Sequence, residues 1–76
     1  MSAAERFGKE VARVRREAGL SQGDLAKLAS ISPEEIDQLE QGEAKVTLDM
    51  LVKMSGSLGV SLDDLLFGRG SREGDG

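Results

Sequence analysis

The chain has 76 residues, a formal net charge of −4, and neither cysteine nor histidine. Without these two residue types it cannot form a disulfide framework, a thiolate or imidazole metal site, or a histidine general base. So short a chain has little volume for a catalytic pocket, and its apolar segments are shorter than the ~20 residues that span a bilayer. We therefore expect a non-enzymatic, cytoplasmic domain without a cofactor or a metal.

A repeated spacing of serine and an acidic residue predicts where the helices begin. In a capping box, a serine hydroxyl and an acidic side chain three residues later each accept a hydrogen bond from the other residue's backbone N–H. The spacing occurs at Ser2/Glu5, Ser21/Asp24, Ser32/Glu35 and Ser61/Asp64. Thr47 followed by Asp49 predicts a fifth helix start. Because no segment alternates as a half-buried strand does, the predicted class is all-α, with five helices.

The first predicted helix covers residues 3–18 and ends at Gly19. Its apolar residues recur at helical spacing and form the stripe Phe7, Val11, Val14 and Ala18. The second predicted helix covers only residues 22–29. It buries Leu25 and Ala26, with Leu28 as a further candidate for the core.

The third predicted helix covers residues 33–41 and ends at Gly42, with Pro33 in its first turn, where proline loses no hydrogen bond. Its inward residues are Ile36 and Leu39. The fourth covers residues 48–58 and ends at Gly59. Its inward residues are Leu48, Leu51, Met54 and Leu58.

Gly56 lies inside the fourth helix and costs about 1 kcal/mol relative to alanine. A close approach of two helices at this position is one explanation, and the sequence does not decide it. A fifth helix of one or two turns covers residues 62–66. Residues 68–76 contain no apolar residue that could be buried, and a disordered tail or linker stub is predicted for them.

Only Ser30, Ile31 and the cap Ser32 separate the second and third predicted helices. Two short helices joined by such a tight turn meet at a sharp angle, which is the geometry of a helix-turn-helix. Many small helical bundles contain a tight turn of this kind. The turn alone therefore does not establish a function.

A longer set of residues carries a resemblance to a known protein family. It is spread over residues 11–67, about three-quarters of the chain, and keeps the family's spacing throughout. The set includes Val14-Arg15-Arg16, Gly19-Leu20-Ser21-Gln22, Leu25-Ala26, Ile31-Ser32, Ile36, Leu39-Glu40-Gln41-Gly42, Thr47-Leu48 and the run Leu58 to Gly68. In these residues the chain resembles the lambda-repressor/Cro-like (XRE) helix-turn-helix family. The resemblance implies a compact five-helix DNA-binding domain over residues 11–67, with residues 1–10 as the start of the first helix. It also implies that the third helix enters the major groove, and that two protomers bind a two-fold site.

Three residues have a structural role in the family that the resemblance carries over. Arg15 and Glu40 match positions that form an ion pair between the first and third helices. Gln22 matches a position that contacts a phosphate and braces the start of the recognition helix. On a helical wheel Glu40 lies about 40° from Ile36, which favours a paired, half-buried carboxylate over a solvated one. The alternatives are two solvated charges worth ~0 to 1 kcal/mol and an ordinary first-turn glutamine.

The outward face of the third helix carries the predicted contacts to DNA bases. With Ile36 inward, Gln41, Glu34 and Gln38 lie at about 140°, 160° and 200° on the wheel. Gln38 can make a two-point contact with adenine, and Glu34 can accept a hydrogen bond from a cytosine amino group. Glu35 and Asp37 flank these positions, so this face carries three carboxylates and no base.

The acidic third helix departs from the family, whose members commonly place basic or neutral polar residues there. Residues 21–49 contain seven acidic and two basic residues, whereas residues 1–20 contain three acidic and five basic. Carboxylates repel the phosphates that lysine and arginine attract. The predicted phosphate contacts are therefore Gln22, Arg13, Arg16, Lys45 and Thr47, together with backbone N–H groups at helix starts.

Two functions remain open on this reading. The first is a sequence-specific regulator, a repressor or small controller protein, that binds double-stranded DNA as a homodimer through the apolar residues Leu62, Leu65, Leu66 and Phe67. The second is an interaction module, such as an antirepressor, an antitoxin or an adaptor, whose acidic third helix docks on a basic protein. We weigh the second because the carboxylates weaken the function that normally accompanies this fold.

Overall fold

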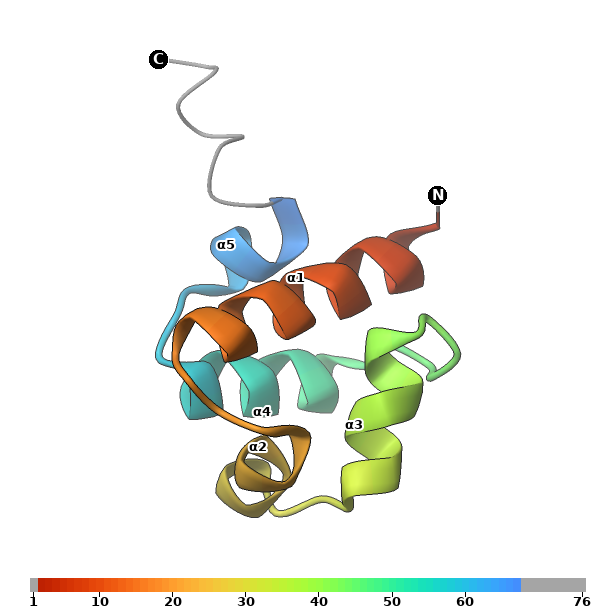
Figure 1. Ribbon diagram of the computed structural model, residues 1–76. Coiled ribbons are helices and arrows are strands. Elements are labelled where there is room, and N and C mark those ends of the chain that lie inside the picture. Colours follow the sequence, from red (N-terminus) through yellow and green to blue (C-terminus); the bar gives the residue numbers. More distant parts are fainter. Residues whose placement is uncertain (1, 68–76) are drawn as a thin grey trace.

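The computed structural model describes residues 2–67, and within this range the chain forms five α-helices (Figure 1). They are α1 (Ala3–Glu17), α2 (Gln22–Ala29), α3 (Pro33–Glu40), α4 (Leu48–Leu58) and α5 (Leu62–Phe67). The predicted all-α, five-helix class is confirmed. The tail predicted at residues 68–76 lies outside the described residues. None of the helices described is long and apolar enough to cross a membrane.

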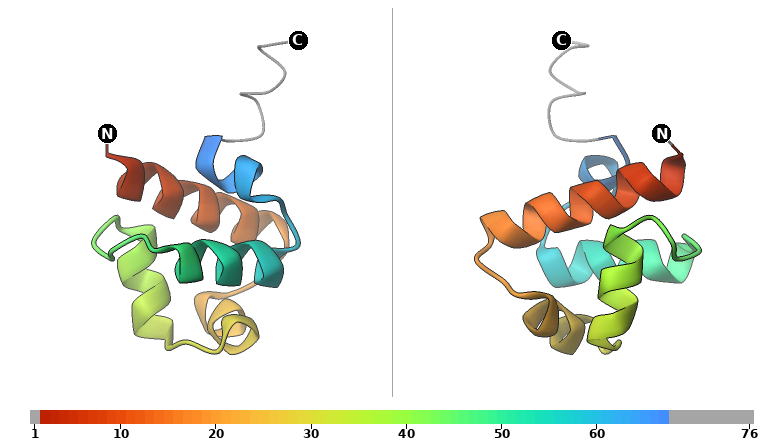
Figure 2. Two further views of the ribbon diagram at one scale, coloured as in Figure 1. Left: turned by 180° about the vertical axis from the view of Figure 1, so that it is seen from behind. Right: turned by 45° about the vertical axis from the view of Figure 1, so that its right-hand side comes forward.

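The helices wrap around one core. In Figures 1 and 2, α1 and α4 run side by side through the middle of the molecule, with α5 on one side and with α2 and α3 on the other. α3 packs against both α1 and α2, and α2 also packs against α4. The outer side of α3 therefore stays open to solvent at one end of the molecule.

The predicted helix starts are confirmed at the level of single hydrogen bonds. Complete capping boxes begin α1, α2 and α3 at Ser2, Ser21 and Ser32. Thr47 accepts a hydrogen bond from the Met50 N–H at 3.2 Å and begins α4. Before α5, the Ser61 hydroxyl accepts from the Asp64 N–H at 3.1 Å. Hydrogen bonds from the Ser2 and Ser21 backbone N–H groups lower the pKa values of Glu5 and Asp24.

Ten buried apolar residues from all five helices form the core: Phe7, Val11, Val14, Leu25, Ala26, Ala29, Ile36, Leu39, Met54 and Leu65. Three residues predicted or considered for the core lie outside it. Ala18 is exposed because α1 ends one residue earlier. Leu28 is 58% exposed because it lies about 100° around α2 from the inward face. Leu48, the first residue of α4, is 71% exposed because helical side chains point toward the N-terminus, here past the helix end.

The turn between α2 and α3 depends on an unusual backbone conformation. Ser30 ends α2 with φ of 60°, in the left-handed region that L-amino acids other than glycine rarely adopt. Its N–H donates to the carbonyl oxygens at the end of α2, and the Ile31 N–H donates to the Ala26 carbonyl at 3.0 Å. This cap turns the chain sharply enough for α3 to begin at Pro33.

The close helix approach considered for Gly56 is found at Gly8 instead. A Cβ atom on Gly56 would meet no other atom within 4 Å, so this glycine faces open space. A Cβ atom on Gly8 would overlap the backbone carbonyl oxygen of Leu39 and press on that of Glu40. α1 and α3 therefore cross in contact at Gly8, which no pattern in the sequence had indicated.

Candidate nucleic-acid interface

The structure brings Arg15 of α1 and Glu40 of α3 together at the crossing of their helices. The Arg15 guanidinium donates from Nε to Glu40 Oε2 at 2.6 Å and from Nη2 to Glu40 Oε1 at 3.2 Å. Its Nη1 donates to the Leu20 carbonyl oxygen at 2.8 Å. The two side chains are only 11% and 7% exposed, and the hydrogen bond with Glu40 raises the pKa of Arg15. α3 is thus tied to both α1 and the loop that leads into α2.

Gln22, the first residue of α2, extends this network. Its side-chain Nε2 donates to Glu40 Oε1 at 3.0 Å and to Asp37 Oδ1 at 3.3 Å. Asp37 also accepts from Gln41 Nε2 at 2.8 Å. The hydrogen bonds of Gln22 therefore reach the middle and the last turn of α3, and not its start as the resemblance implied.

The predicted base contacts divide into two groups. Glu34 and Gln38 are both exposed and line one hollow beside α3. Gln41 is exposed too, but it follows the last residue of α3 and lines a different hollow, toward α1. The structure therefore places Glu34 and Gln38 together and sets Gln41 apart from them.

Two adjoining hollows of opposite character lie along α3. The first, which we call the α3 hollow, is lined by Gln22, Ser32, Pro33, Glu34, Glu35, Asp37 and Gln38. The second, the α1–α3 hollow, is lined by Lys9, Ala12, Arg15, Arg16, Gln22, Asp37, Glu40 and Gln41. Gln22 and Asp37 line both. The α3 hollow has carboxylates and no basic residue, whereas the α1–α3 hollow carries three basic residues against two carboxylates.

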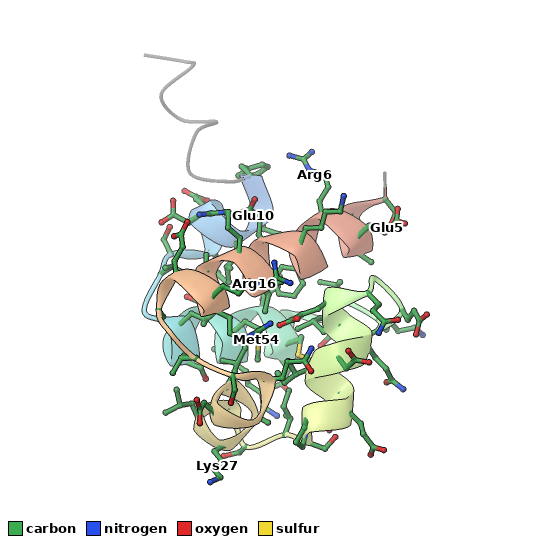
Figure 3. All side chains as sticks on the ribbon, viewed as in Figure 1. Glu5, Arg6, Glu10, Arg16, Lys27 and Met54 are labelled. Atoms are coloured by element: carbon green, nitrogen blue, oxygen red, sulfur yellow. The ribbon has the colours of Figure 1, made fainter. Side chains whose placement is uncertain are left out.

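Of the predicted phosphate contacts, Gln22 and Arg16 line the α1–α3 hollow, whereas Arg13 does not. Arg13 forms ion pairs along α1 with Glu10 at 2.6 Å and with Glu17 at 2.9 Å. Figure 3 shows Glu10 on the side of α1 away from α3, and Arg16 on the front of α1 toward α2 and α3. The hydrogen bond with Glu10 and, to a smaller extent, that with Glu17 raise the pKa of Arg13. Its guanidinium is therefore held away from the other predicted contacts.

The remaining predicted phosphate contacts lie around the connection between α3 and α4. Lys45 is exposed within this connection. Thr47 is exposed as well, and its hydroxyl accepts the capping hydrogen bond of α4. Both follow the end of α3 in the chain, and neither lines either of the two hollows.

The apolar residues predicted to form a dimer interface differ in exposure. Leu65 is fully buried against the core, so it belongs to the fold and not to a free surface. Leu62 and Leu66 are half-buried, and Phe67 is 54% exposed. This correction follows from the short length of α5, which needs one residue to anchor it to α1 and α4.

Two residues of this region escaped the sequence reading. Gly8 permits the contact between α1 and α3, and Lys9 lines the hollow between them. No local pattern could reveal either, because both owe their position to the crossing of two helices. Only the apolar spacing of α1, which turns this side of the helix toward α3, gave an indirect signal.

Two short helices, α2 and α3, are joined by a tight turn, and α3 is anchored on its inner side and open on its outer side. This arrangement defines a helix-turn-helix domain of the DNA-binding class. Residues 11–65 match the helix-turn-helix family. The chain belongs to this family, in its lambda-repressor/Cro-like (XRE) form. No curated protein sequence gives a significant match.

Solved structures of regulators resemble the chain along most of its length. The clp gene regulator ClgR from Corynebacterium glutamicum is 26% identical, with a TM-score of 0.85 over 90% of this chain and 88% of its own. The restriction-modification controller protein C.AhdI from Aeromonas hydrophila is 27% identical, with a TM-score of 0.78 over 82% of this chain and 94% of its own. The P22 c2 repressor, solved in complex with a synthetic operator, is 29% identical, with a TM-score of 0.74 over 82% and 94%.

Proposed function

We propose that the chain is a sequence-specific transcriptional regulator that binds double-stranded DNA as a dimer on a two-fold operator. The observation that carries the proposal is the anchoring of α3: Arg15 and Gln22 hold Glu40 from the inside while Glu34 and Gln38 stay exposed on the outside. A helix held rigidly with polar side chains facing outward is the arrangement that major-groove reading requires. The similarity to a repressor solved with its operator supports the same binding role.

In this proposal Gln38 reads adenine and Glu34 accepts from a cytosine amino group, with Gln41 as a further base contact. Gln22, Arg16, Lys45 and Thr47 contact phosphates, and Arg13 is the weakest candidate because two carboxylates already bind it. The half-buried Leu62 and Leu66 and the exposed Phe67 supply the two-fold interface. The function is one of binding and not of catalysis.

The experiment that tests the proposal is a gel shift with DNA from upstream of the gene, at ~50 mM salt, where phosphate contacts are strongest. The wild type should bind this DNA more tightly than random DNA. Gln38→Ala should lower discrimination at one base pair by ~1–3 kcal/mol and leave affinity for random DNA nearly unchanged. Absence of binding to any genomic fragment would contradict the regulator function.

A second function is favoured by one observation, the three exposed carboxylates of the α3 hollow, where no basic residue neutralises them. Such a face complements a basic protein, and opposite charge speeds association. The double substitution Glu35→Gln with Asp37→Asn separates the two functions. It should strengthen binding to specific and random DNA if α3 reads DNA, because it removes repulsion from phosphates. It should weaken and slow the complex if α3 docks on a basic protein.

A further inference from the structure

The surface along α3 changes sign across its width. In the α3 hollow the charged residues are Glu34, Glu35 and Asp37, all acidic. Gln22 and Asp37 line both hollows. On the other side of them, Lys9 and Arg16 of α1 border the α1–α3 hollow. A DNA-binding surface that is repulsive at its centre needs its attraction to phosphates at its edges, and this edge is the basic one.

Lys9 and Arg16 differ from the other cation of the hollow. Arg15 forms the floor, where it is neutralised by Glu40 and almost completely buried. The side chains of Lys9 and Arg16 are exposed, and within residues 2–67 neither side chain forms a hydrogen bond or an ion pair. Both carboxylates of the lining are already engaged, because Glu40 is paired with Arg15 and Asp37 accepts from the side-chain amides of Gln22 and Gln41. The positive charge of Lys9 and Arg16 is therefore available to an external anion.

The other basic residues of α1 do not face this hollow. Arg13 is held by Glu10 and Glu17. Arg6 is labelled in Figure 3 at the top of α1, pointing away from α2 and α3. Because Lys9 and Arg16 are seven positions apart, close to two full helical turns, they lie on the same side of α1. They mark out a line along the helix that borders α3.

The dimensions of DNA suggest what occupies this line. An α-helix with its side chains is about 10–12 Å across and fills a major groove about 12 Å wide, so a phosphate backbone runs along each side of an inserted helix. We propose that Lys9 and Arg16 hold phosphates of the strand on the α1 side, so that the α1–α3 hollow is a backbone-binding site. This inference rests on the proposed insertion of α3 into the major groove. Lys9 thereby becomes a phosphate contact, and Arg13 ceases to be one.

The test is the salt dependence of binding to a fluorescein-labelled, mixed-sequence duplex, measured by anisotropy from about 50 to 200 mM KCl. The slope of log K against log salt is negative, and each lost phosphate contact lowers its magnitude by about one. The double variant Lys9→Gln with Arg16→Gln should therefore lose about two units of slope. Arg6→Gln is the matched control, since it removes the same charge from the same helix on the side away from α3. Its slope should stay within a few tenths of that of the wild type.

A variant that keeps the charge guards against effects on folding. Lys9→Arg with Arg16→Lys should retain the wild-type slope, and all variants should melt like the wild type because the substituted residues are exposed. If the wild type binds DNA and the double neutral variant keeps its slope, the backbone site is wrong while the proposed function stands. The same conclusion follows if Arg6→Gln lowers the magnitude of the slope by about one unit, the change expected for one lost phosphate contact. If the wild type binds no duplex at all, both the site and the proposed function are wrong.

Discussion

At the scale of single residues, the buried pair of Arg15 and Glu40 decides how firmly α3 is held. Removing one partner of a buried pair leaves the other charge without compensation, which costs more than the pair itself contributes. Glu40 would keep only the amide of Gln22 as a partner if Arg15 were truncated. The stability of the domain therefore depends more on Arg15 than its position on a charged helix suggests.

We expect Arg15→Ala to lower the free energy of unfolding by ~1–3 kcal/mol, because it strands Glu40 in a site that is only 7% exposed. Glu40→Gln should cost less, since a neutral amide tolerates burial better than a lone charge. Urea unfolding of both variants measures the two changes. Equal stability of both variants and the wild type would mean that the pair is solvated in solution.

Ser30 offers a prediction of opposite sign. A left-handed conformation costs a non-glycine residue roughly 1–2 kcal/mol, whereas glycine loses about 0.5–1 kcal/mol of backbone entropy on folding. We therefore expect Ser30→Gly to stabilise the domain by up to ~1 kcal/mol. Its thermal midpoint should rise relative to the wild type. A lower midpoint would show that the serine makes a compensating interaction in solution.

At the scale of elements, the crossing of α1 and α3 depends on a glycine that looks like a defect in a helix. Gly8 is buried, and the backbone of α3 occupies the place where a side chain would begin. Gly56 is exposed in the last turn of α4 with open space around it. Two helical glycines in one small domain thus have opposite roles, one in packing and one without a contact.

The substitutions Gly8→Ala and Gly56→Ala should therefore change stability in opposite directions. Gly8→Ala forces α1 away from α3, and overpacking of this kind costs ~1–3 kcal/mol, more than the ~1 kcal/mol that alanine gains in helix propensity. Gly56→Ala gains the propensity and loses nothing, so it should stabilise by ~0.5–1 kcal/mol. Denaturant midpoints of the two variants give the comparison. A stabilising Gly8→Ala would mean that the crossing is looser than described.

The elements were predictable where their signals are local, and the site only in part. Serine caps, helical spacing of apolar residues and terminal glycines operate within one or two turns, so the helix boundaries agree with the structure to within a residue. Leu65 and Arg13 were assigned to a dimer interface and to DNA on type and spacing alone. In the structure Leu65 is buried in the core, and Arg13 is paired with Glu10 and Glu17. The contact of Leu65 with another helix does not appear on a wheel drawn for one helix, whereas the pairs of Arg13 lie three and four positions apart within α1 and could be read from the sequence spacing.

At the scale of the whole molecule, the exposed apolar residues are the candidates for the interface of the proposed dimer. Phe67 of α5 and Val52 of α4 are 54% and 55% exposed. Because their exposure is nearly equal and they lie on different helices, Val52 serves as a control for Phe67. Burying an aromatic or aliphatic side chain contributes about 1.5–3 kcal/mol. A dimer interface on α5 would therefore depend on Phe67 and not on Val52.

We expect Phe67→Ser to raise the dimer dissociation constant at least about tenfold, because each 1.4 kcal/mol of lost burial is one decade. Val52→Ser should leave the dissociation constant within about a factor of two, because Val52 lies on α4 outside the proposed interface and its substitution removes no apolar surface from it. Sedimentation equilibrium at micromolar concentrations measures both. The opposite ranking would locate the interface on α4, and a monomer at high micromolar concentration would contradict self-association of this chain.

The anchoring of α3 has a consequence for how such a protein can acquire a new target. The residues that fasten the helix, Ile36, Leu39 and Glu40, share no position with Glu34 and Gln38 on its outer side. Substitution at the outer positions therefore leaves the fastening intact, and specificity can change while the scaffold stays the same. In this respect α3 is an interchangeable part. Its outer residues can change between duplicated genes without loss of the fold. Gly8, Arg15 and Gln22 cannot change as freely, because they hold α3 in place.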